Sequence, residues 1–232
     1  MKRFLLTLIA LATALSSLAQ PKGYFCSTKG MSLRYERYSP DNSKHWWTNT
    51  LTINDVQKAG DGSLEIAVSA HIQPRSATPP VKGAVKTKSY LHADGTIEVN
   101  ISEAAAIAAK KRFAAFNFTS SGGTSILKAN ARPGDKLEEI HAEVAWSGIK
   151  YNIDYTERSV VKKETITVPG GTFECIVVKE RKKESAPLYK RERITYTWYA
   201  LGYGMIKHDS YFPDGRQETS EQLYGIETPA GY

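Results

Sequence analysis

The sequence predicts a mainly β protein, with a curved antiparallel sheet or incomplete β-barrel and one short helix. Three observations support this fold class. Apolar and aromatic residues recur with a period of two along much of the chain, turn residues separate these runs, and a single segment has the composition of a helix. Because tight turns join antiparallel neighbours, the chain is expected to form hairpins rather than helical crossovers.

The alternating runs place apolar or aromatic side chains between mostly polar neighbours, which is typical of half-buried strands. Their spacing predicts about ten to twelve strands in one curved sheet. The runs are Leu33-Tyr35-Arg37, Trp47-Asn49-Leu51-Ile53, Leu64-Ile66-Val68-Ala70-Ile72, Ile97-Val99-Ile101, Ile140-Ala142-Val144-Trp146 and Tyr151-Ile153-Tyr155.

Turn motifs lie between the runs. They are Ser39-Pro40-Asp41-Asn42, Gly60-Asp61-Gly62, Asp94-Gly95, Ser147-Gly148, Pro169-Gly170-Gly171 and Pro213-Asp214-Gly215. Asp94-Gly95 suits a tight hairpin. At the fifth motif Pro169 presets φ, and Gly170 is expected to supply the positive φ of a type II turn.

The predicted helix covers residues 102–112. Ser102 is the expected N-cap, Glu103 lies in the first turn, the middle is rich in alanine, and Lys110, Lys111 and Arg112 fall at the negative end of the helix dipole. Two longer polar segments, residues 74–83 and 119–125, are expected to be loops.

The N-terminus has the pattern of a cleaved signal peptide over residues 1–19. Lys2 and Arg3 precede an apolar stretch from Phe4 to Leu15, and Ser17-Leu18-Ala19 is a small-residue cleavage site. The stretch is shorter than the roughly 20 residues that cross a bilayer. The sequence thus predicts no transmembrane segment and a periplasmic or secreted protein, with residues 20–232 forming one β-rich domain.

Export would bring Cys26 and Cys175, the two cysteines, into an oxidising compartment, where pairs of thiols are often bridged. One disulfide is the simplest interpretation. The alternative is two buried, unpaired thiols, because the sequence does not show that the two Cα atoms approach within about 7 Å.

The charge distribution argues against a nucleic-acid partner. The chain has 31 basic and 24 acidic residues, a net charge of +7. The basic residues of segments 179–184 and 190–193 are interleaved with Glu, whereas a nucleic-acid site gathers one sign on one face. These segments are expected to form a solvated, salt-bridged strand pair with its tip near Pro187.

The last third of the chain carries two distinctive motifs. They are Val168-Pro169-Gly170-Gly171-Thr172-Phe173-Glu174-Cys175 and Trp198-Tyr199-Ala200-Leu201-Gly202-Tyr203-Gly204-Met205. They resemble a family of exported bacterial β-proteins that is catalogued as a domain of unknown function. The resemblance implies a curved antiparallel sheet similar to lipoprotein-carrier half-barrels, and it implies no assigned activity and no catalytic residues.

Sequence motifs for catalysis are missing. There is no Gly-x-Ser-x-Gly, His-Glu-x-x-His, Walker or Cys-x-x-Cys pattern, and the five histidines are scattered. We therefore expect no catalytic residues, no metal site and no cofactor. A hydrolase would need carboxylates such as Glu143 and Asp154 to converge from separate strands.

The aromatic residues are the better functional indication, because a curved sheet with an aromatic concave face often encloses a ligand. Alternation places Val144 and Trp146 on one face, and Tyr196 and Trp198 on one face. These four are the candidate ligand-binding residues. The sequence favours a non-catalytic carrier of an apolar or amphipathic envelope molecule, such as a lipid, with a cell-envelope interaction module or, less favoured, a hydrolase as alternatives.

Overall fold

The structure is a computed structural model, and it describes residues 21–74 and 81–229. The signal peptide expected over residues 1–19 lies outside the described residues. So does most of the polar loop expected over residues 74–83.

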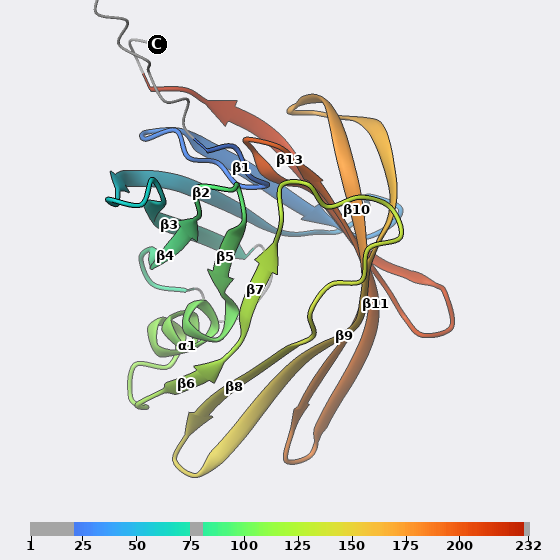
Figure 1. Cartoon of the computed structure of the whole chain (residues 1–232). Coiled ribbons are helices and arrows are strands. Elements are labelled where there is room, and N and C mark those ends of the chain that lie inside the picture. The colour runs from blue at the N-terminus through green and yellow to red at the C-terminus, as the bar shows by residue number, and fades with distance from the viewer. Residues whose placement is uncertain (1–20, 75–80, 230–232) are drawn as a thin grey trace, which may run out of the picture.

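The fold is an antiparallel sheet of 13 strands with one helix, curved into a nearly closed barrel (Figure 1). The predicted fold class is therefore confirmed. The elements are β1 (Ser32–Tyr38), β2 (His45–Lys58), β3 (Leu64–Pro74), β4 (Val85–Leu91), β5 (Ile97–Asn100), α1 (Ile101–Arg112), β6 (Thr119–Gly122), β7 (Thr124–Leu127), β8 (Ile140–Trp146), β9 (Ile149–Val168), β10 (Gly171–Ala186), β11 (Tyr189–Ala200), β12 (Gly204–Tyr211) and β13 (Gln217–Glu227).

The strand order is β6-β8-β9-β10-β11-β12-β13-β1-β2-β3-β4-β5-β7, so most neighbours in the sheet are also neighbours in sequence. Successive strands run in opposite directions, and successive turns therefore lie at opposite ends of the barrel. The lower end in Figure 1 carries α1 and the turns at residues 147–148 and 187–188. The upper end carries the turns at residues 94–95, 169–170 and 201–203.

The barrel closes through one bent segment, where the sequence predicts only a loop. β6 pairs with β8 and β7 pairs with β5, so this segment passes from one edge of the sheet to the other. The bend requires glycine. Gly122 and Gly123 have φ of 63° and 80°, and a Cβ on Gly122 would lie 2.3 Å from the carbonyl oxygen of His141.

The helix α1 lies beside this seam and begins slightly earlier than expected. Its N-cap is Asn100 rather than Ser102, because the Asn100 side chain accepts a hydrogen bond from the backbone N–H of Glu103. Ser102 instead donates to the carbonyl oxygen of Gly122 at 2.7 Å. The predicted N-cap was thus wrong by two residues, and Ser102 fastens the helix to the bent segment.

The turn between β9 and β10 also differs from the expectation. The positive φ, 137°, belongs to Gly171 and not to Gly170. Gly170 is needed for a close approach instead, since its N–H donates to the carbonyl oxygen of Leu223 at 3.0 Å and a Cβ would lie 2.9 Å from the Leu223 side chain. This contact fixes the tip of the β9–β10 hairpin against β13.

Cys26 and Cys175 are free thiols in the structure, and both are buried. The disulfide expected from an oxidising compartment and two cysteines is not formed in the structure, which has the alternative of two buried, unpaired thiols. The Cys26 thiol contacts the sulfur of Met31 at 3.2 Å, and the Cys175 thiol lies near the carbonyl oxygen of Phe173. Burial, with nearby Glu164 and Glu174, raises the pKa of Cys175 to about 12, which makes its thiol unreactive.

Candidate functional site

The inward face of the sheet encloses three cavities of different chemistry. The upper cavity, of about 300 Å³, lies beneath Tyr24 and Tyr203. The other two lie in the lower half. We name them the helix-side cavity, of about 460 Å³ beside α1, and the polar cavity, of about 260 Å³ between β10 and β13.

The helix-side cavity is lined almost wholly by apolar side chains. Three alanines of α1 face it, and their small side chains leave the space open; they are Ala105, Ala108 and Ala109. Aromatic rings close the other side, where Phe118 packs against Trp146 with ring centroids 5.5 Å apart. Arg112 also lines the cavity, and its Nε atom is buried without a hydrogen-bond partner among the described residues.

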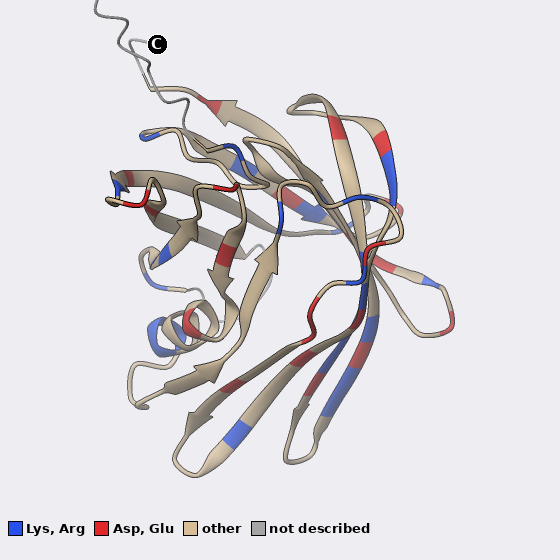
Figure 2. Cartoon of the chain, in the orientation of Figure 1, with Lys and Arg blue, Asp and Glu red and all other residues tan. Residues whose placement is uncertain are grey.

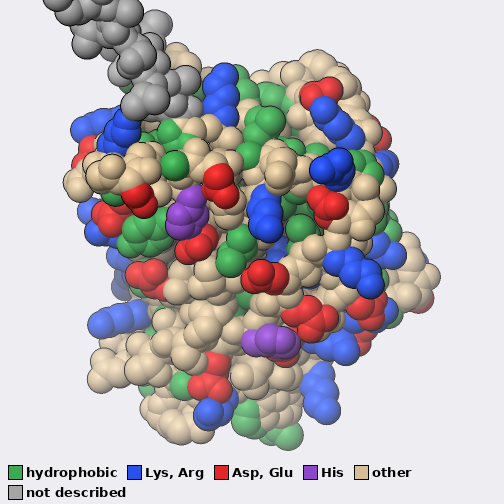
Figure 3. Space-filling model, viewed as in Figure 1, with side chains coloured by type: hydrophobic (Ala, Val, Ile, Leu, Met, Phe, Trp, Pro, Cys, Tyr) green, Lys and Arg blue, Asp and Glu red, His purple; other side chains and the backbone are tan. Residues whose placement is uncertain are grey.

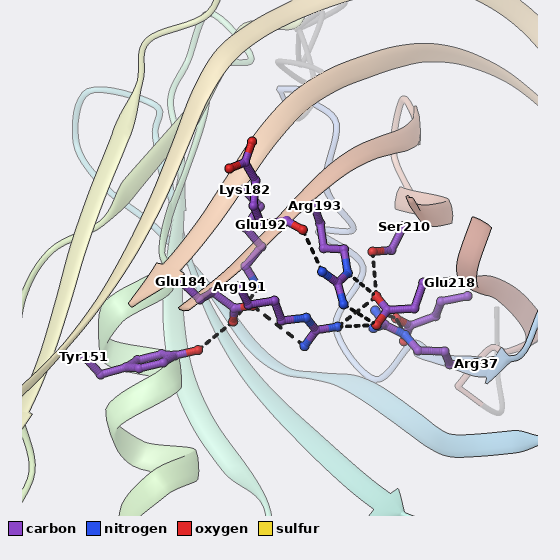
Figure 4. A network of polar contacts seen from close by, with 10 residues as sticks. Arg37, Tyr151, Lys182, Glu184, Arg191, Glu192, Arg193, Ser210 and Glu218 are labelled. Atoms are coloured by element: carbon purple, nitrogen blue, oxygen red, sulfur yellow. Dashed lines mark hydrogen bonds and ion pairs between the residues drawn. The ribbon is translucent and has the colours of Figure 1, made fainter. Parts of the chain in front are cut away.

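The polar cavity is lined by a network of ion pairs that point into the barrel (Figure 4). Glu218 is its centre and accepts hydrogen bonds of 2.8 Å from both Arg191 and Arg193. Lys182 pairs with Glu184 at 3.1 Å. The network has four cations and three carboxylates, so it carries one net positive charge; the members are Arg37, Lys182, Arg191, Arg193, Glu184, Glu218 and Glu221.

The network keeps its acids ionised. Hydrogen bonds from Arg193 and Arg191 lower the pKa of Glu218 to about 2, although burial opposes the shift. Burial raises the pKa of Glu184, but Lys182 and Tyr151 outweigh it and the net shift is downward. The nearby imidazole of His208 is instead kept neutral, because burial, Arg37 and Lys182 lower its pKa to about 3.

One hydrogen bond joins the two lower cavities. The Tyr151 ring lines the helix-side cavity, and its hydroxyl donates at 2.6 Å to Glu184, which lines the polar cavity. The lower interior is therefore apolar beside α1 and charged beside β10 to β13, with Tyr151 at the boundary.

A second ion pair lies deeper in the barrel. Arg158 is 6% exposed and donates from Nε to Glu180 at 2.9 Å, and Glu180 also accepts from the Thr195 hydroxyl. Arg158 reaches Ser125 on β7, across the seam of the sheet. It also lines the upper cavity, so this pair lies between the upper and lower interior.

The four candidate ligand-binding residues separate into two sets. Val144 and Trp146 line the helix-side cavity. Tyr196 and Trp198 line none of the three cavities described, because the inward positions of β11 are held by Thr195 and Thr197, and alternation turns their neighbours outward.

Tyr196 and Trp198 both contact side chains on the outward face of the sheet. The Trp198 indole N–H donates to Glu164 at 2.7 Å, and Lys207 lies over its ring. The Tyr196 ring packs edge-on against Tyr211. The placement of Tyr196 and Trp198 in a concave site is corrected accordingly.

The charged hairpin of residues 179–193 also needs a correction. Its tip is exposed as expected, but one of its faces forms the wall of the polar cavity, and Glu180 and Glu184 are 7% and 9% exposed. The sequence signal for this inward face was the alternation along β10, which places Glu180, Lys182 and Glu184 on the same face as buried Val178. Charge alone suggested solvent, while alternation already placed these residues on the inward face.

The described residues show no metal centre. In residues 21–74 and 81–229, no group of three or more His, Cys, Asp or Glu side chains is placed to hold an ion. Nor does that part of the chain contain a helix long and apolar enough to cross a membrane.

A family model matches residues 29–223. The chain belongs to the DUF3108-like family. The matched range includes both distinctive motifs of the last third, and the predicted resemblance to a domain of unknown function is confirmed. No curated protein matches the chain.

Two solved structures share the fold. One is described as a "putative exported protein" with a YmcC-like fold from Bacteroides fragilis, with a TM-score of 0.69, 16% identity, and coverage of 88% of this chain and 98% of that one. The other is described as a "putative lipoprotein" from Parabacteroides distasonis, with a TM-score of 0.70, 15% identity, and coverage of 89% and 99%. At this identity the likeness establishes the fold alone.

Proposed function

We propose that the protein is an exported, non-catalytic binder of an amphipathic molecule of the cell envelope, such as a lipid. The observation that carries this proposal is the helix-side cavity, whose volume of about 460 Å³ falls in the range of ligand sites. The signal-peptide pattern and the descriptions of the two similar structures support an envelope or secreted location.

The neighbouring polar cavity argues for an amphipathic rather than a purely apolar ligand. The apolar part would lie between α1 and Trp146, and the polar part would reach past Tyr151 toward Arg191. The Nε atom of Arg191 is buried and has no hydrogen-bond partner among the described residues, so one donor is available to a bound group. The net positive charge of the network favours an anionic group.

The test is a titration of the mature protein with palmitate, followed by tryptophan emission and melting temperature. Binding to the native state should stabilise it by about 2.7 kcal/mol at a hundredfold excess over the dissociation constant. Ala108→Phe should fill the cavity and abolish the response while α1 remains intact. An unchanged response in Ala108→Phe, or none in the parent protein, would refute the proposal.

Two tryptophan substitutions give a matched comparison. Trp146→Ala should remove most of the change in emission, because this ring borders the cavity. Trp198→Ala should lower the stability, because this ring is 8% exposed and belongs to the core. It should leave palmitate binding by the folded protein unchanged, because Trp198 lines none of the three cavities.

A further inference from the structure

The lower end of the barrel exposes a cluster of large hydrophobic side chains, which we call the lower rim. It consists of Phe113, Phe116, Ile149, Leu188 and Tyr189, and these are five of the nine exposed large hydrophobic residues in the described part of the chain. Leu188, at the tip of the β10–β11 hairpin, is 109% exposed. Single exposed apolar residues are ordinary, but several at one place indicate an interaction surface.

Strand pairing and ring contacts bring the rim residues together. The β8–β9 and β10–β11 turns share one end of the sheet, because Asn152 on β9 pairs with Ser185 on β10. The Tyr151 and Tyr189 rings have centroids 6.2 Å apart. The segment after α1 reaches the same place through the row of rings Phe116, Phe118 and Trp146.

Cations accompany the hydrophobic side chains. Lys110 and Lys111 lie in the last turn of α1, before Phe113. Lys150 follows Ile149, and Lys190 follows Tyr189. Lys150 pairs with Glu143 at 2.9 Å. Figure 3 shows hydrophobic side chains at the lower end of the molecule with both basic and acidic side chains near them, and Figure 2 shows basic residues on α1 and the two hairpins, interspersed with acidic ones.

We propose that the lower rim docks on the surface of a lipid bilayer that contains anionic lipids. Apolar tips flanked by lysines match such a surface, because the tips enter the boundary between headgroups and acyl chains while the ammonium groups meet lipid phosphates. The projecting Leu188 and the separate tips suit a soft surface better than a flat protein partner.

Docking in this way turns the helix-side cavity toward the bilayer. Phe113 and Phe116 belong to the rim and also line the cavity, so an apolar path leads from the docked surface to the cavity. The proposal goes beyond ligand binding and holds whether or not the cavity takes a lipid.

The test is flotation of the mature protein with vesicles of phosphatidylglycerol and phosphatidylcholine, compared with vesicles of phosphatidylcholine alone, at low salt. We expect binding to the anionic vesicles, weakened by added salt because exposed charges are screened. Lys110→Gln and Lys190→Gln should each weaken the affinity about fivefold, as expected for a lysine near an anionic bilayer.

Leu188→Asp should abolish most of the flotation without changing the melting temperature, since the side chain contacts solvent alone. Leu201→Asp is the matched control, because Leu201 is 47% exposed at the opposite, upper end of the barrel. The same loss in both variants would overturn the proposal, as would a parent protein that does not float. A parent that fails to float but forms a dimer sensitive to Leu188→Asp would identify a second copy as the partner. Leu188→Asp should still bind palmitate, and measuring this binding distinguishes a loss of membrane docking from a loss of the ligand cavity.

Discussion

The two sides of the lower barrel interior hold opposite chemistry, although alternating strands contribute to both. Beside α1 the inward residues are alanines, Val144 and aromatic rings, which leave an apolar space. Beside β10 to β13 the inward residues are paired arginines, Lys182 and glutamates, which together leave one net positive charge. The comparison teaches that alternation determines which strand side chains face the interior, and that a charged side chain is stable there only when an opposite charge pairs with it.

The charged side is expected to depend on complete pairing. A buried ion pair adds little net stability, but removing one partner leaves an uncompensated charge and costs much more. The apolar side has no such requirement, so cavity volume rather than pairing should govern the effect of substitutions there.

The largest effect is expected from Glu180→Ala. It leaves Arg158, which is 6% exposed, without its carboxylate, and the free energy of unfolding should fall by about 3 to 5 kcal/mol in urea titrations. The double variant Glu180→Leu with Arg158→Met should recover much of this loss. If the single variant is as stable as the parent protein, the charged side does not depend on pairing and the contrast fails.

Acid should weaken the charged side through His208 before its carboxylates protonate. The folded protein holds His208 neutral to about pH 3, whereas the unfolded chain takes up a proton below about pH 6.5, so stability falls with falling pH. Between pH 6.5 and 4.5 the uptake of this proton by the unfolded chain should lower the free energy of unfolding by at most about 1.4 kcal/mol per pH unit.

The matched variant is His208→Gln, which keeps a polar group next to Thr197. Its unfolding free energy should depend on pH less than that of the parent protein in this window, and equal slopes would contradict the prediction. The contribution of Glu218, whose pKa is about 2, should be lost only below about pH 4.5 in both proteins.

The smallest effect separates two neighbouring lysines. Lys183 is exposed on the outer face, so Lys183→Ala should change stability by no more than about 0.5 kcal/mol. Lys182 faces the polar cavity and pairs with Glu184, so Lys182→Ala should cost more, about 1 kcal/mol. Thermal denaturation of both variants measures the difference, and equal effects would place Lys182 in solvent.

Much of the fold was predictable because alternation and turns are local signals. Ile140 to Trp146 was expected as a strand and is β8, and the helix was placed within one residue at its start and at Arg112 at its end. The bent segment at Gly122 was predicted as a loop, because its two short strands are defined by pairing with β8 and β5, which are distant in sequence.

The site was only half predictable. Val144 and Trp146 follow from alternation, but the choice between them and Trp198 depends on which face of the sheet curves inward, and this is a property of the whole sheet. The polar cavity was missed because Arg191 and Arg193 resemble surface residues until Glu218, from another hairpin, is placed beside them.

The pairing of β1 with β13 has a consequence for folding kinetics. Ser32, near the start of the described chain, lies opposite Glu227, near its end, so the sheet joins the two most distant strands of the sequence. Such non-local contacts slow folding because a very long loop closes before they form. Until β13 arrives, β1 and β12 each present an unpaired edge to other chains, which makes the incomplete chain prone to aggregation. During synthesis from the N-terminus the chain therefore remains vulnerable until β13 is free to fold.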